Sequence, residues 1–439
     1  MNVAGPSILA RLVIGCALAL VLGRSALHGQ DWRESFVTSF DVVWQTVAET
    51  YYDAGFGGLD WGAVRTELRP RMTLAETPAS ARAVIREMVG RLGQSHFAVI
   101  TADQEDDSLR GPATVPIDVR VDGADVIVTA VVGESSASRA GLRVGDRVRA
   151  INGRGLTSVG PSSAASGAAR RAEDRRAWQR VMRDLSGDPG STARIAWVRP
   201  DGSTDDAEVT RVVGDGDVVS FGQLPPFRAR VRVEDARTPA GRVVGVIGFN
   251  VWMPIVAQPF DSAIDRFRGA DGLVIDLRGN PGGLADMIRG IAGHVVAESL
   301  LLGRMRMRVA DLEFRANPRR ATVDGRRVEP YAGPVAVLVD GLTGSASECF
   351  AGGLQSLGRV RVFGTTTMGQ ALPAATRSLP NGDVFMYAVG DFVTSTGRRL
   401  EGEGVLPDEV VPLDPGALAA GRDAEWHALR WIDRVAAAR

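Results

Sequence analysis

The sequence predicts an α/β protein whose layered core follows a helical domain and a strand-rich domain. In the C-terminal half, short apolar runs alternate with helix-like segments, which is typical of a sheet covered by helices. Near the N-terminus, apolar residues recur at steps of three and four, which indicates amphipathic helices. A chain of 439 residues is long enough for two or three domains with ordinary hydrophobic cores.

Composition narrows the possible functions. The net charge is −1, so the overall charge balance does not suggest a nucleic-acid partner. The two cysteines are Cys16 and Cys349, and because Cys16 lies in the leader, the mature chain has no disulfide framework. All 51 basic residues are arginine. A mechanism that needs a lysine is therefore excluded.

Residues 1–30 have the pattern of a secretory signal peptide. Arg11 is followed by an apolar stretch at 12–23 and then by small and polar residues, and this stretch is short for a transmembrane helix. An uncleaved membrane anchor is the alternative. We therefore expect export to the periplasm or another part of the cell envelope, with the N-terminus as a possible membrane attachment.

Residues 31–111 are predicted to form a helical domain. A second helix is expected at 79–92, with Gly93 as its stop signal. Just after this stop come Ser95 and His96. The apolar residues that define one buried face of the first helix are Phe36, Phe40, Val43, Trp44, Val47 and Tyr51.

His96 differs from the other histidines of the chain. His28 lies in the leader, whereas His294 and His427 lie in helix-like surroundings that suit a packing role. Only His96 follows a helix stop and has a serine beside it, so it is the best candidate for a chemical role.

Residues 112–213 are predicted to form a second, strand-rich domain. A strand is expected at 126–132, a helix at 177–185, and closing strands at 193–198 and 207–213. Residues 157–175, rich in Ser, Ala, Gly and Arg, are interpreted as a flexible insertion.

Residues 214–439 are predicted to form the α/β core. The expected strands are 243–249, 273–277, 335–339 and 360–363, and the expected helices are 263–267, 284–297 and 346–357. Residues 276–283 (DLRGNPGG) follow one of these strands, and their glycines allow a sharp turn with exposed N–H groups.

Ser345 lies where the strand 335–339 leads into the helix 346–357. A serine at the start of a helix is close to free N–H groups that can bind an oxyanion. The segment 345–348 (SASE) also matches a capping box, so Ser345 could serve only to cap the helix.

The segment 138–153 closely resembles the signature of a PDZ domain of the bacterial protease type. Such domains bind an extended peptide by strand addition and hold its terminal carboxylate on backbone N–H groups. The resemblance implies a peptide site at Arg139, Ala140, Gly141 and Leu142.

The order of motifs resembles the carboxyl-terminal processing and tricorn-type serine peptidases. After the helical segment and the PDZ-like domain come DLRGNPGG, SASE, GTTTMG and EGEGVLPD. The resemblance implies an α/β (α+β) core similar to the ClpP/crotonase group, an acyl-enzyme on Ser345, and oxyanion donors at Ala346 and Gly283. It implies no metal or organic cofactor.

One position departs from the processing peptidases, whose base is a lysine. Gln370 occupies that position, and a glutamine amide cannot accept the serine proton near neutral pH. Arginine is too basic to replace it. In the tricorn-type branch a histidine is the base, with a serine and a glutamate behind it, which corresponds here to His96, Ser95 and Glu401, with Glu403 as the rival glutamate.

The sequence therefore predicts an exported serine endopeptidase that acts on protein or peptide substrates. The alternative, from another class, is a catalytically inactive PDZ scaffold that binds peptides. A processing or signalling protease that needs a partner is a third possibility. The sequence does not predict an oligomeric state.

Overall fold

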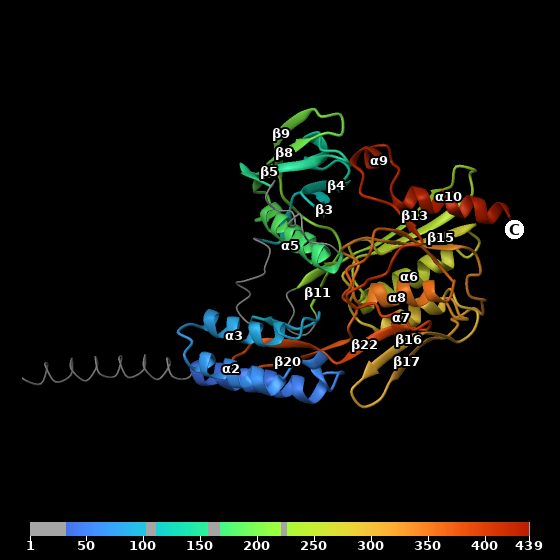
Figure 1. The fold of residues 1–439 in the computed structure, drawn as a ribbon. Coiled ribbons are helices and arrows are strands. Elements are labelled where there is room, and N and C mark those ends of the chain that lie inside the picture. The colour runs from blue at the N-terminus through green and yellow to red at the C-terminus, as the bar shows by residue number, and fades with distance from the viewer. Residues whose placement is uncertain (1–31, 102–110, 157–166, 221–225, 439) are drawn as a thin grey trace, which may run out of the picture. The chain divides into compact units, whose positions relative to one another are not determined.

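The structure is a computed structural model, and it describes residues 32–101, 111–156, 167–220 and 226–438. The predicted signal peptide at 1–30 lies outside these residues. The chain divides into two compact units. One contains the described residues up to 101 together with Ala374–Val389, and the other contains the remaining described residues (Figure 1).

The first unit is helical, as predicted, with a small sheet. Phe36, Phe40, Val43 and Val47 are buried on one face of the helix formed by residues 32–50, Trp44 is half-buried, and Tyr51, directly after the helix, is buried as well. The other elements are η1 (Phe56–Gly58), α2 (Trp61–Thr73), α3 (Pro78–Gly90) and the antiparallel strands β1 (Ala98–Ile100), β21 (Val384–Ala388) and β20 (Ala374–Ser378).

The prediction that residues 214–439 form one domain is corrected by this small sheet. Ala374–Val389 leaves the core and pairs with β1, where Phe385 is fully buried among the helices. A buried ion pair between Arg82 and Asp383, 2.9 Å apart, fixes the same hairpin. This pairing joins strands almost 300 residues apart, so local sequence patterns do not reveal it.

The second unit begins with the predicted PDZ domain, an antiparallel sheet in the order β3-β4-β5-β8-β9, with β6 on β5. Its elements are β2 (Ala113–Thr114), β3 (Ile117–Asp122), β4 (Asp125–Val131), α4 (Ser136–Arg139), β5 (Arg147–Ile151), β6 (Arg154–Gly155), α5 (Gly167–Leu185), β7 (Ser186–Gly187), β8 (Thr192–Val198), β9 (Thr204–Thr210) and β10 (Val212–Val213).

Helix α5 corrects the predicted flexible insertion at 157–175. Residues 157–166 lie outside the described part, but 167–175 are the first half of α5. Their alanines and arginines favour a helix. Ala177, Val181 and Leu185 bury one face of the same helix in the core of the domain.

The core is a six-stranded sheet in the order β13-β14-β15-β18-β19-β23, parallel except for the β13–β14 pair. Its strands are β13 (Val231–Arg237), β14 (Val243–Phe249), β15 (Gly272–Asp276), β18 (Val335–Val339), β19 (Arg361–Gly364) and β23 (Glu409–Val410). A smaller sheet pairs β17 (Leu312–Ala316), β16 (Leu300–Met307) and β22 (Gly390–Thr394), and β11 (Asp217–Val219) pairs with β12 (Phe227–Ala229).

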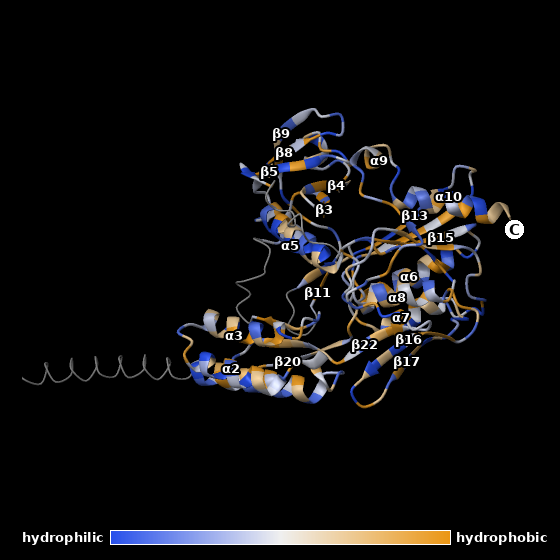
Figure 2. Cartoon of the chain, viewed as in Figure 1, coloured by the Kyte–Doolittle hydropathy of each residue, from blue (hydrophilic) through white to orange (hydrophobic). Residues whose placement is uncertain are grey.

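Helices cover both faces of the core sheet (Figure 1). On one face, α6 (Pro254–Arg266), α7 (Asp286–Gly293) and α8 (Ala346–Ser356) pack on every second strand residue. On the other, α10 (Ala424–Ala437) packs on the alternate residues, and α9 (Pro415–Ala419) precedes it. The strands are correspondingly rich in hydrophobic residues (Figure 2).

The arrangement of the parallel strands positions the candidate site. β14, β15 and β18 run in the same direction, so the segments that follow them emerge at one edge of the sheet. These segments contain Trp252, the Gly282–Gly283 turn and Ser345. Among the helices of the described residues, none combines the length and hydrophobicity that a membrane span requires.

Candidate active site

Ser345 lies in a strained backbone conformation at the start of α8, with φ 52° and ψ −117°. In the described part of the chain only five non-glycine residues have positive φ, and His96 is another, with φ 60°. Such conformations cost on the order of 1–3 kcal/mol and persist only where the surroundings enforce them. Two of the residues proposed from the sequence are therefore held in unusual conformations.

The buried carboxylate of Glu348 enforces the conformation around Ser345. It accepts hydrogen bonds from the Ser345 N–H (3.1 Å), the Gly369 N–H (2.7 Å), the Gln370 N–H (2.9 Å) and the Thr367 hydroxyl (2.5 Å). Burial raises its pKa to about 7, although these hydrogen bonds oppose the shift. Glu348 thus caps α8, as the capping-box interpretation predicted, and also ties the 367–370 loop to Ser345.

The Gly282–Gly283 turn faces Ser345 and Ala346. A Cβ atom on Gly282 would lie 2.6 Å from the Ser345 Cβ and 3.0 Å from the Ala346 nitrogen, so only glycine permits this approach. The Gly282 N–H already donates to Asn280 Oδ1 at 2.9 Å. Among the described residues, no acceptor takes the N–H of Gly283 or of Ala346. The two N–H groups predicted to bind an oxyanion are therefore not used by other acceptors in the described part of the chain.

Gln370 lies beside Ser345, but its side-chain amide is not a base. Its backbone oxygen accepts from the Ser345 N–H at 2.8 Å, and its side-chain oxygen accepts from Arg175 of α5. Arg171 of the same helix donates to the carbonyl oxygens of Gly402 (2.7 Å) and Glu403 (3.1 Å). The helix of the PDZ domain thus contacts both loops next to Ser345. Burial lowers the pKa of the Arg175 guanidinium.

Glu401 and Glu403, the two candidate relay glutamates, differ in burial and in their contacts. Glu401 is 6% exposed, and its Oε2 accepts from the Ala371 N–H at 2.9 Å, directly after Gln370. The Glu403 side chain is 66% exposed and lies 3.8 Å from Arg398. Of the two, only Glu401 is a buried carboxylate held at the loop that borders Ser345.

Ser95 and His96 lie between α3 and β1 in the first unit, whereas Ser345 belongs to the second. The Ser95 hydroxyl and His96 Nδ1 are 2.7 Å apart, a hydrogen bond that orients the imidazole ring. The serine predicted to lie behind the base is therefore in contact with it.

The other two histidines in the described chain have structural partners. His294 is 1% exposed, with Nε2 2.7 Å from Asp261 Oδ1. His427 Nδ1 lies 2.8 Å from Glu409 Oε1, with the ring edge-on to Trp426. Both fit the packing roles expected from their helix-like surroundings.

The predicted peptide site at Arg139–Leu142 is not supported by the geometry. The N–H groups of Arg139, Ala140, Gly141 and Leu142 already donate to Ser135, Ser136, Ser138 and Ala137, respectively, over 2.9–3.1 Å. The Leu142 side chain is buried in the domain core. A loop whose N–H groups are all satisfied by its own turn has no donors left for a carboxylate.

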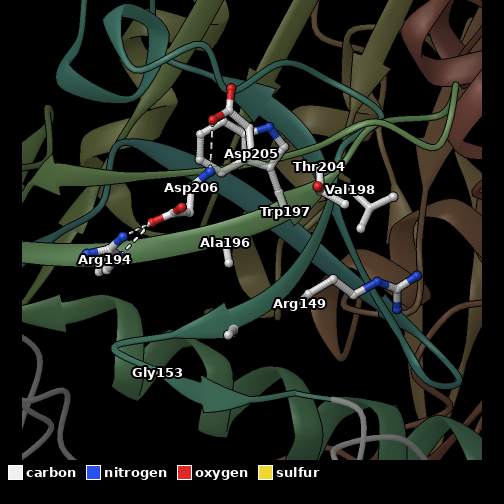
Figure 3. Close-up of a pocket in the computed structure, with 10 residues that line it drawn as sticks. Arg149, Gly153, Arg194, Ala196, Trp197, Val198, Thr204, Asp205 and Asp206 are labelled. Atoms are coloured by element: carbon white, nitrogen blue, oxygen red, sulfur yellow. Dashed lines mark hydrogen bonds and ion pairs between the residues drawn. The ribbon is translucent and has the colours of Figure 1, made fainter.

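A pocket of about 520 Å³ lies on the outer face of the PDZ sheet, over β5, β8 and β9 (Figure 3). Arg149, Ala196, Val198, Thr204 and Asp206 are among the residues that line it. None of the candidate catalytic residues contributes to this pocket.

Sequence analysis missed three residues that build the site. Trp252 holds the glycine turn through its backbone, Asn280 holds it through its side-chain amide, and Arg175 reaches Gln370 from another domain. Asn280 lies within the DLRGNPGG motif, and an amide side chain this close to the glycines could have indicated that it holds their turn by a hydrogen bond. No local pattern indicated Trp252 or Arg175.

Three family models match successive parts of the chain. Peptidase family S41 matches residues 243–411, the Tricorn protease C1 domain matches residues 30–90, and a PDZ domain matches residues 105–170. Their order agrees with the order of the predicted domains.

Two curated proteins illustrate the similarity in sequence. The carboxyl-terminal-processing protease of Picosynechococcus sp. is 26% identical over 416 residues, which cover 91% of this chain and 89% of that protein. The chloroplastic carboxyl-terminal-processing peptidase 3 of Arabidopsis thaliana is 25% identical over 378 residues, covering 83% and 67%, respectively.

Solved structures show the same fold. The photosystem II D1 C-terminal processing protease matches with a TM-score of 0.54 and 20% identity, over 89% of this chain and 98% of that one. Mature CPAF matches with a TM-score of 0.59 and 16% identity, over 92% and 97%. Domain matches, sequence relatives and fold agree: the chain is a serine peptidase in which residues 243–411 match peptidase family S41 and which carries a PDZ domain.

Proposed function

We propose that this peptidase is an exported endopeptidase in which His96, and not a lysine, activates Ser345. The observation that carries the proposal is the strained Ser345 beside two unused N–H donors, in a chain without lysine. Histidine titrates near neutral pH and can both accept and return a proton. Ser95 Oγ bonds His96 Nδ1, so the proposal assigns proton transfer to Nε2.

The proposed reaction has two halves. Ser345 Oγ attacks the scissile carbonyl carbon while His96 Nε2 takes the hydroxyl proton, and the Gly283 and Ala346 N–H groups bind the resulting oxyanion. The C–N bond then breaks, and the imidazolium gives its proton to the departing amine. A water molecule repeats the sequence on the acyl-enzyme and releases Ser345.

Ser95 and Glu401 complete the proposed relay. The imidazolium formed during attack carries a positive charge, which a hydroxyl and a carboxylate behind Nδ1 stabilise. Glu401 is preferred to Glu403 because it is buried beside Ala371, whereas Glu403 is exposed. The proposal requires that the imidazole reach Ser345 in the working enzyme.

We further propose that the PDZ domain binds C-terminal segments of substrates along β3. Strand addition needs an edge strand, and the sheet order makes β3 an edge, next to α5. The carboxyl-terminal processing named for the relatives fits this mode of recognition. An amidated peptide should then bind more weakly than the free acid.

Labelling with a fluorophosphonate probe tests the catalytic proposal. The purified wild-type protein is expected to take up label, and Ser345→Ala is expected to take up none. Gln370 in the lysine position favours the second candidate, an inactive peptide-binding scaffold. Absence of label in a folded wild-type protein that still binds peptides would establish that candidate instead.

Export is proposed from the leader alone. Its short apolar stretch after Arg11 indicates a cleaved signal peptide, with membrane attachment through an uncleaved leader as the alternative. Cell fractionation followed by N-terminal sequencing of the recovered protein distinguishes these two outcomes. Recovery of the full-length chain from the cytoplasm would contradict both.

A further inference from the structure

Trp252 connects the two segments that carry the unused N–H donors. Its backbone N–H donates to the Gly282 oxygen at 2.9 Å, and its backbone oxygen accepts from the Leu284 N–H at 2.8 Å. These two bonds bracket Gly283 and fix the direction of its N–H group.

The Trp252 side chain reaches the second segment. Its indole Nε1 donates to the Ser347 hydroxyl at 2.7 Å, and Ser347 directly follows Ala346 in the first turn of α8. Both side chains are fully buried, so water does not compete for this hydrogen bond. One residue therefore holds Gly283 through its backbone and the neighbour of Ala346 through its side chain.

Packing prevents the indole from shifting. The ring lies edge-on to Phe249, with centroids 4.9 Å apart, and tilted against Phe350 at 5.2 Å. A Cβ on Gly283 would lie 2.4 Å from the Trp252 oxygen, so the backbone contact is as close as a glycine allows. Trp252 is thus a rigid spacer between the two turns.

We propose that Trp252 is a positioning residue for the oxyanion hole, whose indole N–H sets the spacing between the Gly283 and Ala346 donors. The inference rests on the proposed catalytic function. Oxyanion donors act only within a narrow distance of the developing charge, so a small change in their spacing lowers the rate while leaving ground-state binding intact.

The test compares Trp252→Phe, Ser347→Ala and the double variant on a short peptide substrate. We expect Trp252→Phe to lower kcat about tenfold with KM nearly unchanged. Affinity for a peptide aldehyde, whose adduct with Ser345 places an oxyanion in the hole, should fall by the same factor. The double variant should be no slower than the slower single variant, because both changes break one bond.

Trp197→Phe is the matched control. Trp197 is 1% exposed in the PDZ core, and its Nε1 has no hydrogen-bond partner in the structure, so the change removes the same atoms without breaking a bond. It should leave short-peptide kcat unchanged. A parallel fall of kcat and melting temperature in both tryptophan variants, or an unchanged kcat in Trp252→Phe, would overturn the proposal.

Hydrogen exchange separates this inference from the catalytic proposal. Trp252→Phe should increase amide exchange in residues 282–284 and 345–348, and Trp197→Phe should not. If the wild type takes no fluorophosphonate label, the catalytic proposal fails, yet the exchange result still decides whether Trp252 holds both segments. Unchanged exchange in either segment would refute the positioning role.

Discussion

Two turns of the second unit, one at Arg139–Leu142 and one formed by Gly283 and Ala346, were expected to bind a negatively charged group through backbone N–H groups. Only the second has N–H groups without an acceptor among the described residues. At Arg139–Leu142 all four N–H groups donate within the turn itself. At Gly283 and Ala346 the N–H groups have no acceptor among the described residues, because Trp252, Asn280 and Glu348 hold the surrounding backbone instead.

The difference shows that composition alone does not make an anion site. Both turns are rich in glycine and alanine, which permit sharp turns. The Arg139–Leu142 turn follows the short helix α4, and the carbonyl groups of residues 135–138 accept all four of its N–H groups. The second is assembled from the ends of separate parallel strands, and buried side chains from elsewhere fix it in an open conformation.

The largest expected effect comes from removing His96, the proposed base for Ser345. His96→Ala should lower hydrolysis by about 10⁴-fold or more and abolish fluorophosphonate labelling, because an unactivated hydroxyl is a poor nucleophile. The melting temperature should remain nearly unchanged, since His96 is only half-buried. Steady-state kinetics and calorimetry measure the two quantities.

Gln370→Ala is the control for the base. Gln370 contacts Ser345 through its backbone oxygen, which the substitution keeps. Measurable hydrolysis should therefore remain. Full activity of His96→Ala, or complete loss in a well-folded Gln370→Ala, would show that the relay is wrongly assigned.

A matched pair of glycine substitutions tests the two turns directly. Gly283→Ala should lower kcat about 10²–10³-fold, because its Cβ would lie 2.4 Å from the Trp252 oxygen and displace a donor. Gly141→Ala strains a positive φ of 92° but meets nothing closer than Arg199 at 3.8 Å. It should cost about 1 kcal/mol of stability and leave short-peptide kcat unchanged.

Active-site titration should accompany these measurements, so that kcat refers to folded enzyme alone. If Gly283→Ala and Gly141→Ala lowered kcat equally, the Gly283–Ala346 turn would not differ from the Arg139–Leu142 turn in its importance for catalysis.

The sequence predicts well what depends on local pattern. The strands β14 and β18 have the predicted bounds, because continuous apolar runs flanked by turn residues determine them. The motifs around Ser345 and Gly283 likewise lie at one edge of the core sheet, where the predicted nucleophile and oxyanion donors come together. Long-range contacts escape such patterns: the pairing of β20 and β21 with β1, the Trp252–Ser347 bond and the approach of Arg175 to Gln370 all join distant segments.

Titration of Glu348 is expected to change stability with pH. Its folded-state pKa of about 7 lies above the ordinary 4.5, so the folded protein binds this proton more tightly than the unfolded chain does. The resulting stabilisation is full below about pH 4.5 and is lost as the pH rises through 7, a change of about 3 kcal/mol. Arg171 and Arg175 of α5 are charged groups near enough to interact with this carboxylate.

Denaturant unfolding at pH 5 and pH 8 measures this contribution. Glu348→Gln should lose it, so that the difference in unfolding free energy between the two pH values shifts by about 2.5 kcal/mol relative to wild type. Glu298→Gln, at an exposed position, should follow the wild-type profile. Identical profiles for all three proteins would mean that the Glu348 carboxyl does not titrate in this range.

The smallest expected effect concerns where the PDZ domain binds its peptide. Val128 directs its N–H and C=O groups to Asp146 and Gly145, so the groups of its cross-strand partner Val119 face the open edge of β3. The Trp178 indole and the Arg120 guanidinium both donate to the Val119 oxygen, each at 3.0 Å. A peptide strand added at this edge must displace both donors, so removing the indole lowers the cost of binding. Trp178→Phe should therefore tighten binding of a free-acid peptide about threefold.

Fluorescence anisotropy on a Ser345→Ala background, where the peptide is not cleaved, measures this affinity. Arg139→Ala is the matched change at the Arg139–Leu142 turn. It should leave the affinity unchanged, because all four N–H groups of that turn already donate within the turn. An amidated peptide should bind more weakly to both variants, since a terminal carboxylate is part of the recognition. If Arg139→Ala bound the peptide more weakly and Trp178→Phe bound it as the wild type does, the peptide site would lie at the Arg139–Leu142 turn and not at the β3 edge.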